Sequence, residues 1–261
     1  MFANTDYKLV DVAKKILKKL ILKDLKIYKE ILKSSLKTIY KIKISSNEAV
    51  LVGKKLLPYM VEKKGQMKQL IYLQDIKKVN NFQKRSKKTL ALMEKAYQKC
   101  KDLKRDAVLV DLDFTTKNRI SKFGALWLAG LVDTEGSIYL FKHHIDRYVS
   151  CLVITNTSYR IISEARYIIE SRLGKSIKLI IEKRPEHQDV YRIRLLGENA
   201  KEICRYILPH MISKNKQAKL ILDIQNLKIK KRPYSTKVSN RMGTLYASSR
   251  YLNHRGPQLL V

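Results

Sequence analysis

Two carboxylates stand at the C-terminal end of a predicted apolar helix, where acids are unusual. The stretch 126–137 reads LWLAGLVDTEGS, so that Asp133 and Glu135 come just before Gly136. A helix C-terminus already carries partial negative charge, so Lys or Arg is the stabilising choice there. A hard divalent cation with oxygen ligands would stabilise acids at this position. The alternative is a helix with a polar, solvent-exposed end.

The elements that must position these acids are predicted from hydrophobic periodicity and turn residues. A helix over 123–134 is closed by Gly136, and its Ala129 and Gly130 would let a second helix approach closely. The following elements are two strands, a helix, two strands and two helices, over 137–142, 148–155, 159–173, 177–182, 190–195, 199–211 and 217–228. The order αββαββαα predicts an α+β fold with antiparallel sheets.

A second feature of the sequence is an internal repeat. Around Pro58 it reads LLPYMVEKKGQMKQLIYLQDIK, and around Pro209 it reads ILPHMISKNKQAKLILDIQNLK, an offset of 151 residues (209 − 58). Two further blocks recur at offsets of 151 and 152, namely Tyr40-Lys-Ile at 191–193 and Asn4-Thr-Asp-Tyr at 156–159. Three blocks in the same order indicate a duplicated unit. The first copy has no counterpart of the helix that carries the two acids.

The repeat divides the chain into four segments. We expect an incomplete first repeat over 1–79, a basic and partly helical connector over 80–122, a complete repeat over 123–228 and a basic irregular tail over 229–261. Apolar residues of the connector fall on one helix face: Leu90, Met93, Ala96, Tyr97, Cys100 and Leu103.

The charge of the chain indicates a polyanionic partner. Its 55 Lys and Arg against 23 Asp and Glu give a formal net charge of +32, which is typical of nucleic-acid binding. Three widely spaced cysteines fit neither a disulfide framework nor a zinc knuckle and suit a reducing compartment. No run reaches the ~18 apolar residues of a membrane span, so we expect no membrane partner. The Lys- and Ile-rich composition favours a protein encoded in a mitochondrion or chloroplast, with a bacterial cytoplasm as the alternative.

The stretch LAGLVDTEG at 128–136 resembles the signature of the LAGLIDADG homing endonucleases. The resemblance covers 123–228 and the later part of the first copy. It implies that the motif helices of two repeats pack side by side and that the sheets form a saddle on double-stranded DNA. It also implies Mg²⁺ at the scissile phosphates and phosphodiester hydrolysis at a long, intron-insertion-type site.

The resemblance assigns roles near the motif helix. Glu135 matches the acid that holds the metal, with the carbonyl of Thr134 as a second ligand. Asp133 matches an acid that supports the helix end. Ala129 and Gly130 match the interface between the paired helices.

Outside the helix, the resemblance assigns two further catalytic positions. Lys214 matches a basic residue near the scissile phosphate, and Asn156 matches a polar residue that orients the attacking water. Their counterparts in the first copy are Lys63 and Asn4. The alternative for Lys214 is one solvated lysine among many.

Outward-facing side chains of the strands would contact DNA. Ile138, Leu140 and Lys142 are predicted to point toward the helices. The outward and basic candidates for DNA binding are Tyr139, Phe141, His143, Arg147, Lys178, Arg184, Arg192 and Arg194. The alternative for each is a solvated strand-face residue.

A single motif acid leaves several interpretations open. The start of the sequence is misplaced, or the endonuclease is decaying, or two chains pair through the one motif helix in place of a pseudo-twofold monomer. Two other functions need no second acid: a maturase that binds group I intron RNA, and a DNA- or RNA-binding regulator without cleavage.

Overall fold

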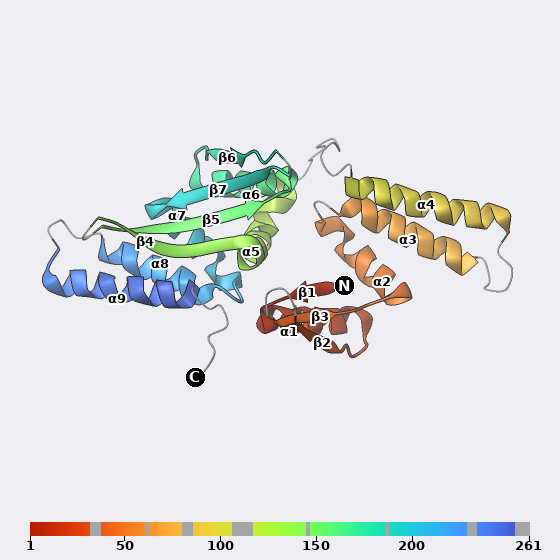
Figure 1. The fold of residues 1–261 in the computed structure, drawn as a ribbon, viewed down its shortest axis with the longest axis horizontal. Coiled ribbons are helices and arrows are strands. Elements are labelled where there is room, and N and C mark those ends of the chain that lie inside the picture. Colours follow the sequence, from red (N-terminus) through yellow and green to blue (C-terminus); the bar gives the residue numbers. More distant parts are fainter. Residues whose placement is uncertain are drawn as a thin grey trace. The chain divides into compact units, whose positions relative to one another are not determined.

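Helix α5 (Lys117–Glu135) carries the two acids at its end and opens the part of the chain that holds the complete repeat. The computed structural model describes residues 1–31, 38–60, 63–79, 86–105, 117–144, 147–185, 188–228 and 234–253. The chain divides into Met1–Leu112 and Asp113–Val261, called here unit 1 and unit 2 (Figure 1). The predicted connector is therefore divided between the units, and its helix belongs to unit 1.

Unit 2 is a four-stranded antiparallel sheet in the order β4-β5-β7-β6, with helices against one face (Figure 1). After α5, its elements are β4 (Gly136–His144), β5 (Arg147–Asn156), α6 (Tyr159–Leu173), β6 (Leu179–Glu182), β7 (Val190–Leu196), α7 (Gly197–Ile207), η2 (Leu208–His210), α8 (Asn215–Leu227) and α9 (Thr236–Asn253). The predicted order αββαββαα is confirmed, with α9 added at its end.

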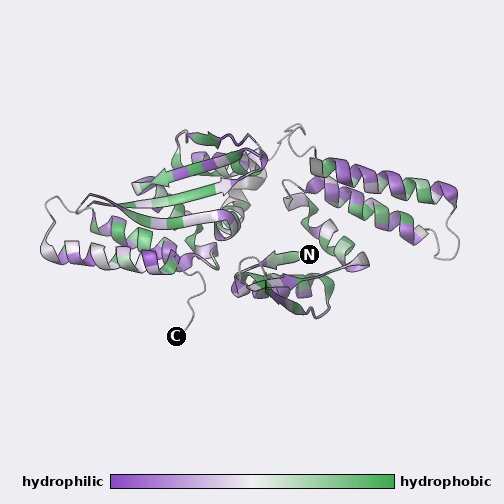
Figure 2. Cartoon of the chain, in the orientation of Figure 1, coloured by the Kyte–Doolittle hydropathy of each residue, from purple (hydrophilic) through white to green (hydrophobic). Residues whose placement is uncertain are grey.

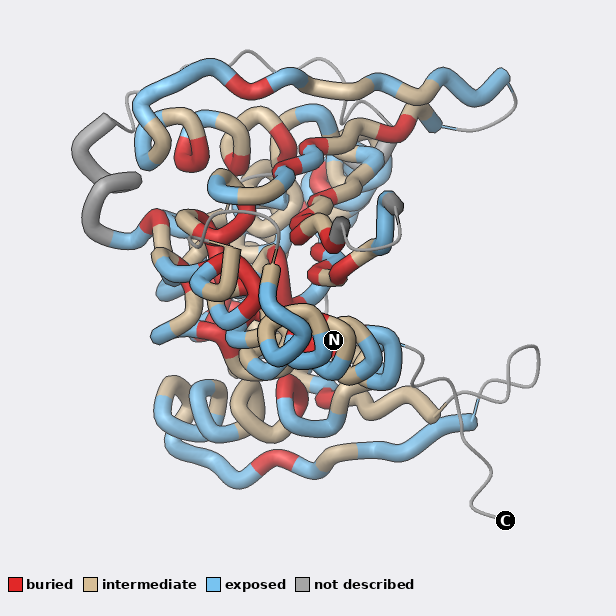
Figure 3. The backbone as a smooth tube through the Cα atoms, turned by 90° about the vertical axis from the view of Figure 1, so that its left-hand side faces the viewer, coloured by how far each residue is buried: buried red, intermediate tan, exposed pale blue. Residues whose placement is uncertain are grey.

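The core of unit 2 follows the period-2 pattern of its strands. Ile138 pairs with Leu152, Ile154 pairs with Ile193, and all four are buried beneath the helices. Figure 2 shows apolar residues interleaved with polar ones along the elements, and Figure 3 shows buried and exposed positions alternating in the same way. Lys142 keeps this register opposite the buried Tyr148, and its ammonium lies 6.0 Å from the Tyr148 ring centroid, although the side chain is exposed.

Helix α9 corrects the prediction of an irregular tail. Met242 and Leu245 are buried, and the Ser249 hydroxyl accepts a hydrogen bond from the Leu140 N–H at 3.0 Å. The Asn253 amide donates to the Ile138 carbonyl at 2.9 Å. These polar side chains satisfy backbone groups of β4, which is an edge strand of the sheet. The helix was not predicted because part of the face that packs on the sheet is polar.

Unit 1 has a smaller antiparallel sheet in the order β1-β3-β2. Its elements are β1 (Phe2–Asn4), α1 (Tyr7–Ile21), β2 (Ile27–Ile31), β3 (Thr38–Ile42), α2 (Ser46–Leu56), η1 (Leu57–Tyr59), α3 (Lys64–Val79) and α4 (Lys87–Arg105). The buried core of the sheet region consists of Val10, Leu25 and Ile42. Helices α3 and α4 pack against each other as a hairpin.

The sequence repeat has a structural counterpart at the strand-to-helix turns. The Asn4 side chain accepts from the Asp6 N–H, and the Asn156 side chain accepts from the Ser158 N–H, both at 2.8 Å. Each turn is followed by an edge-on tyrosine pair, Tyr7–Tyr40 at 5.1 Å and Tyr159–Tyr191 at 5.2 Å between ring centroids. The two units therefore share local geometry as well as sequence.

Glu164 on α6 gives a test of burial in unit 2. Burial raises the pKa of its carboxyl, although the nearby Arg160 guanidinium opposes the shift. A raised folded-state pKa means that the charged form destabilises the fold as the pH rises through that pKa. Glu164→Gln should therefore raise the Tm at pH 7 by roughly 1–2 °C and leave it unchanged near pH 4. The control Asp223→Asn removes an exposed charge on α8 and should shift the Tm less. A Tm at or below wild type at pH 7 would contradict the assignment.

Candidate functional site

Asp133 is held by the backbone that leads into α8. Its carboxylate is buried and accepts hydrogen bonds from the N–H groups of Ile212, Ser213 and Lys214 at 2.7, 3.2 and 2.9 Å. Residue Lys214 is the N-cap of α8, so the carboxylate lies at a helix N-terminus, which favours negative charge. The acid is thus stabilised by a second helix, as the prediction of a helix-end support requires.

Lys214 makes the reciprocal contact with the end of α5. Its ammonium donates to the carbonyls of Val132, Asp133 and Gly136 at 2.9, 2.8 and 2.7 Å. The last carbonyls of a helix lack partners within the helix, and an ammonium group has three donors to offer. Lys214 therefore lies beside the end of the motif helix, where these bonds hold the helix-to-strand junction, and its role at the scissile phosphate stays a prediction.

The hydrogen bonds that Asp133 and Lys214 make between the end of α5 and the start of α8 are called the clamp here. Glu135 lies within the clamp, and its side chain is exposed. It is the last residue of α5, and the carbonyls of Asp133 and Gly136 on either side of it are both bound by Lys214. Its own carboxylate has no hydrogen bond or ion pair with any residue that the structure describes. The local backbone is therefore fixed while the carboxylate is available to a ligand.

Gly136 is required at the junction because α5 turns directly into β4. A Cβ atom there would lie 2.7 Å from the Val132 carbonyl oxygen and 2.8 Å from the Val132 Cα. At Gly130, by contrast, a Cβ would meet nothing within 4 Å.

These two glycines give a matched prediction. Gly136→Ala should destabilise the protein by about 1–3 kcal/mol, because backbone atoms must move to admit the methyl group. Gly130→Ala, in an exposed part of a helix, should stabilise it by about 0.5–1 kcal/mol. Urea denaturation of both variants measures the difference. Equal stabilities would contradict the close packing at Gly136.

The structure corrects one of the two residues that were predicted at the interface between paired helices. Ala129 is fully buried in the core of unit 2, so it does not lie on a face that another helix could approach. Gly130 is exposed, and Phe123 and Leu126 on the same helix are 41% and 50% exposed. The face that remains for a helix partner therefore includes Gly130 without Ala129.

Asn156 and Lys63 lie at turns that precede helices. The side-chain oxygen Oδ1 of Asn156 accepts a hydrogen bond from the Ser158 N–H, and the role of Asn156 at an attacking water stays a prediction. Lys63 precedes α3 in unit 1, and its side chain is exposed. Its backbone carbonyl accepts from Met67 as that of Lys214 accepts from Ala218, which supports the equivalence of the two lysines.

The outward face of the unit 2 sheet gathers several of the predicted DNA contacts. Tyr139 and Phe141 are only partly buried, with ring centroids 6.3 Å apart. The guanidinium carbon of Arg194 lies 5.6 Å from the Phe141 ring centroid. Arg192 forms an ion pair with Glu182 at 3.0 Å. Aromatic rings of β4 and guanidinium groups of β7 therefore form a patch on this face, with β5 between the two strands.

The remaining predicted DNA contacts lie at the ends of strands. Lys178 and Arg184 flank β6 and are exposed, and Arg184 pairs with Glu182 at 2.8 Å. Hydrogen bonding with Arg184 is the main cause of the lowered pKa of Glu182. His143 is exposed near the end of β4. Arg147 begins β5, and its side chain lies outside the described residues.

Cys151 is a member of this face that sequence reasoning missed. Its fully buried thiol contacts the side chains of Tyr139 and Arg194. Burial is the main cause of the raised pKa of Tyr139, and the contact with Cys151 is the main cause of the raised pKa of Arg194. The alternation of β5 was the available signal, since it places Cys151 opposite Tyr139 on the same face.

In the described segments, no three His, Cys, Asp or Glu side chains cluster as metal ligands. A metal at α5 would therefore depend on Glu135 together with backbone, water or phosphate oxygens. Among the described helices, none is long and apolar enough to span a bilayer.

Comparisons with known proteins agree with this fold. Residues 122–208 match the family model of the LAGLIDADG-like domain. A search of curated protein sequences gave no match. The solved structure of I-SmaMI bound to an uncleaved DNA target with calcium ions is 15% identical, covers 95% of this chain and 86% of its own, and has a TM-score of 0.60. The LAGLIDADG meganuclease I-AabMI bound to uncleaved DNA is 14% identical, covers 94% and 87%, and also has a TM-score of 0.60. At these identities the likeness shows the fold.

Proposed function

We propose, from the premise that residues 122–208 form a LAGLIDADG-like domain, that this chain is a site-specific DNA endonuclease that hydrolyses phosphodiester bonds with a divalent metal. The observation that carries the proposal is the state of Glu135. Its exposed carboxylate has no partner among the described residues, yet it lies in a backbone junction that Asp133 and Lys214 hold in place. A fixed junction with an available acid suits metal binding better than it suits a stabilising role.

The oxygen donors at the end of α5 fit Mg²⁺ in kind and number. Mg²⁺ in phosphoryl chemistry uses one or two carboxylates and completes its shell with water and phosphate oxygens. Glu135 would supply the carboxylate, and Thr134 would supply a carbonyl that is not among the three Lys214 acceptors. When bound, the metal would neutralise charge at the scissile phosphate. The clamp would hold the Glu135 backbone in place, so that little of the site would have to reorganise when the phosphodiester bond is cleaved.

The outward sheet face of unit 2 would bind the DNA. Aromatic and guanidinium groups can read base edges in the major groove, and the +32 net charge would attract the phosphates. I-SmaMI, whose fold this chain shares, has been solved with both uncleaved and cleaved DNA. A long intron-insertion-type site is the corresponding proposal for the target.

Arg194 provides a test of the DNA-binding face. Arg194→Gln should weaken DNA binding and reduce the slope of log K against log[salt] by about 1 if the guanidinium contacts a phosphate. Lys219→Gln is the matched control, because Lys219 is exposed on α8, a helix that packs on the opposite face of the sheet. Fluorescence anisotropy with labelled duplex at several salt concentrations measures both. Equal losses in the two variants would indicate only a general effect of charge and would contradict the assigned face.

The test of the proposed function is cleavage of duplex DNA that joins the sequences flanking the chain's own coding region. We expect strand cleavage with Mg²⁺ and none with EDTA. A scrambled duplex of the same length and composition is the control for specificity.

A second candidate is a group I intron maturase. The observation that favours it is that the described residues of unit 1 include no counterpart of Glu135, since RNA binding would need the basic surface and not this acid. Tight binding of the intron RNA without DNA cleavage, unaffected by Glu135→Gln, would support the maturase over the nuclease.

A further inference from the structure

Each of the two sheets carries one acid in its described strands, and the two acids hold the same place in the repeat. Glu30 of β2 and Glu182 of β6 are 152 residues apart (182 − 30). Glu30 pairs with Ile39 of β3, and Glu182 pairs with Val190 of β7, 151 residues after Ile39. The acids therefore match in strand register as well as in sequence.

Each acid forms an ion pair with the same cation of the neighbouring strand. Lys41 of β3 and Arg192 of β7 are 151 residues apart (192 − 41). The Lys41 ammonium pairs with the Glu30 carboxylate, and the Arg192 guanidinium pairs with the Glu182 carboxylate at 3.0 Å. Arg184 also pairs with Glu182, at 2.8 Å. Because these cations hold the pKa of both carboxyls below the usual value, both acids are ionised at neutral pH.

The paired charges lie on the outward faces of the sheets. Lys41 and Arg192 each precede an isoleucine, Ile42 or Ile193, that is fully buried beneath the helices. Successive residues of a strand point to opposite faces, so the two cations point outward, and the ion pairs place the acids beside them. In unit 2 the side chains of Arg192 and Glu182 are 36% and 41% exposed. The pair is therefore accessible on the face proposed above to bind DNA.

The next basic residue, two positions along each chain segment, is held without an acid. The Lys43 ammonium lies 5.5 Å from the Tyr28 ring centroid, and the Arg194 guanidinium carbon lies 5.6 Å from that of Phe141. Neither cation forms an ion pair with an acid that the structure describes. A stacked cation is available to a phosphate, whereas a phosphate near the paired cation would meet the carboxylate as well. The acids thus make two neighbouring cations different.

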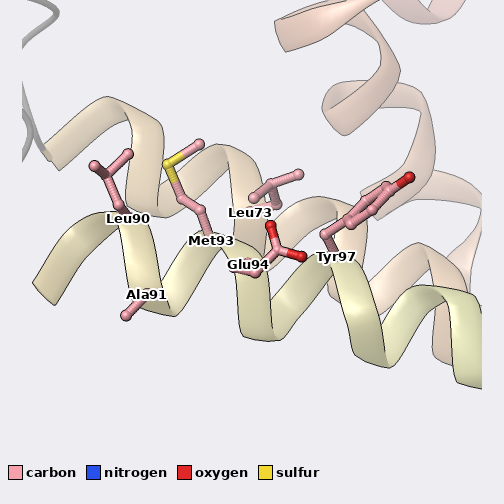
Figure 4. A pocket seen from close by; sticks show the side chains of 6 residues that line it. All are labelled: Leu73, Leu90, Ala91, Met93, Glu94 and Tyr97. Atoms are coloured by element: carbon pink, nitrogen blue, oxygen red, sulfur yellow. The ribbon is translucent and has the colours of Figure 1, made fainter. Parts of the chain in front are cut away.

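The pairing is not simply a result of the excess of basic residues. Glu94 of α4 lines an apolar pocket of about 540 Å³ together with Leu73 of α3 and Tyr97 (Figure 4). It forms no ion pair with any described residue, although the chain has 55 Lys and Arg. A repeated ion pair at one register position therefore calls for a specific explanation.

A carboxylate on a DNA-binding face has few favourable ligands. It repels phosphates, and in the major groove it accepts hydrogen bonds only from the amino groups of cytosine N4 and adenine N6. The cation beside it donates to guanine O6 and N7. A G·C pair presents those two acceptors next to the cytosine amino group, which is the complement of a cation beside a carboxylate. An A·T pair presents the thymine O4 acceptor in place of that amino group, and this oxygen would face the carboxylate.

We infer that Glu182 is a specificity-determining residue, which reads a G·C pair together with Arg192: the guanidinium binds guanine and the carboxylate binds cytosine. Glu30 and Lys41 read a second G·C pair in the same way. The inference rests on the DNA binding proposed above. Because each acid also repels phosphates, it lowers the affinity for duplexes that do not match, which increases selectivity.

The test measures the binding of Glu182→Gln and wild type to the joined-flank duplex, which joins the sequences flanking the coding region. Further duplexes change each of its G·C pairs to A·T, one at a time. At one G·C pair or more, the change should weaken wild-type binding by about 10-fold or more. In Glu182→Gln that penalty should fall to about 3-fold or less at one such pair, because an amide offers its N–H₂ to thymine O4 as readily as its oxygen to cytosine N4. Fluorescence anisotropy in EDTA at one salt concentration measures both.

A scrambled duplex provides a second measurement on the same proteins. Glu182→Gln should bind it more tightly than wild type does, because a charge that repels phosphates has been removed. The variant should therefore gain affinity for DNA in general while it loses discrimination between base pairs.

Glu202→Gln is the matched control. Glu202 of α7 also pairs with two guanidinium groups, those of Arg172 at 2.6 Å and Arg205 at 2.9 Å. Helix α7 packs on the opposite face of the sheet, away from the proposed DNA. This variant has the same change in net charge as Glu182→Gln and should keep every base-pair penalty of the wild type.

The outcomes separate this inference from the proposed function. If wild type prefers the joined-flank duplex over the scrambled one but tolerates every G·C change, the inference is overturned. The same holds if Glu182→Gln keeps all wild-type penalties, or if Glu202→Gln loses as much discrimination. A wild-type chain that binds both duplexes equally would overturn the proposed site specificity, and the inference with it.

Discussion

Glu135→Gln is expected to lower the rate of Mg²⁺-dependent strand cleavage by about 10³-fold while leaving DNA affinity in EDTA unchanged. The amide keeps the size of the side chain and removes the negative charge that would hold the metal. Loss of a preorganised electrostatic contact at a reacting phosphate has effects of this order. Single-turnover cleavage with enzyme in excess measures the chemical step, and anisotropy in EDTA measures binding.

The control for this result is Glu198→Gln on α7. Glu198 is a solvent-exposed acid whose removal changes the net charge of unit 2 by the same amount. Its variant should cleave at the wild-type rate. If the Glu135→Gln protein cleaves within about 3-fold of the wild-type rate, Glu135 does not hold the metal, since loss of its charge would then cost almost nothing.

Asp133→Asn is expected to have the largest effect on stability, about 2–4 kcal/mol of the free energy of unfolding. The buried carboxylate accepts three backbone N–H groups. An asparagine offers one oxygen to these donors and turns an N–H₂ group toward the others, so buried donors lose their acceptor. Urea denaturation, followed by the fluorescence of Trp127 in α5, measures the loss.

A cycle with Lys214→Met separates this clamp from a general packing defect. Asp133 and Lys214 tie the same two elements, so the double variant should be more stable than the sum of the single losses predicts. The exposed Asp223→Asn is the charge control and should stay within 0.5 kcal/mol of wild type. Additive losses would show that the two residues act independently.

The regular part of unit 2 could be predicted from the sequence because its strands alternate and its helices carry apolar stripes. Helix α9 was not predicted from the sequence, because Ser249 and Asn253 lie on the face that contacts the sheet and polar residues are usually assigned to the surface. Their partners are backbone groups of β4, which no residue pattern reveals. The mixed composition of 236–253 therefore gave no sign of a helix that covers the edge strand β4.

The two acids of the site could be predicted from the sequence, whereas the groups that contact them could not. The position of Asp133 and Glu135 at a helix C-terminus indicated a cation, and the resemblance to the LAGLIDADG signature assigned metal binding to Glu135 and support of the helix end to Asp133. The backbone donors of 212–214 could not be predicted, because any residue supplies an N–H. Ala129 and Gly130 are adjacent and therefore point in different directions on a helix, so only burial distinguished the core residue from the exposed one.

The number of strands cut is the measurement that tests the central claim most directly. A supercoiled plasmid that carries the joined flanking sequence would be incubated with the chain in Mg²⁺, and the nicked and linear products would be separated on a gel. Because Glu135 of unit 2 has no counterpart among the described residues of unit 1, we predict a site-specific nick that disappears in EDTA and with Glu135→Gln. A plasmid that stays supercoiled in Mg²⁺ under conditions of saturated DNA binding, or a nick that survives Glu135→Gln, would contradict the account.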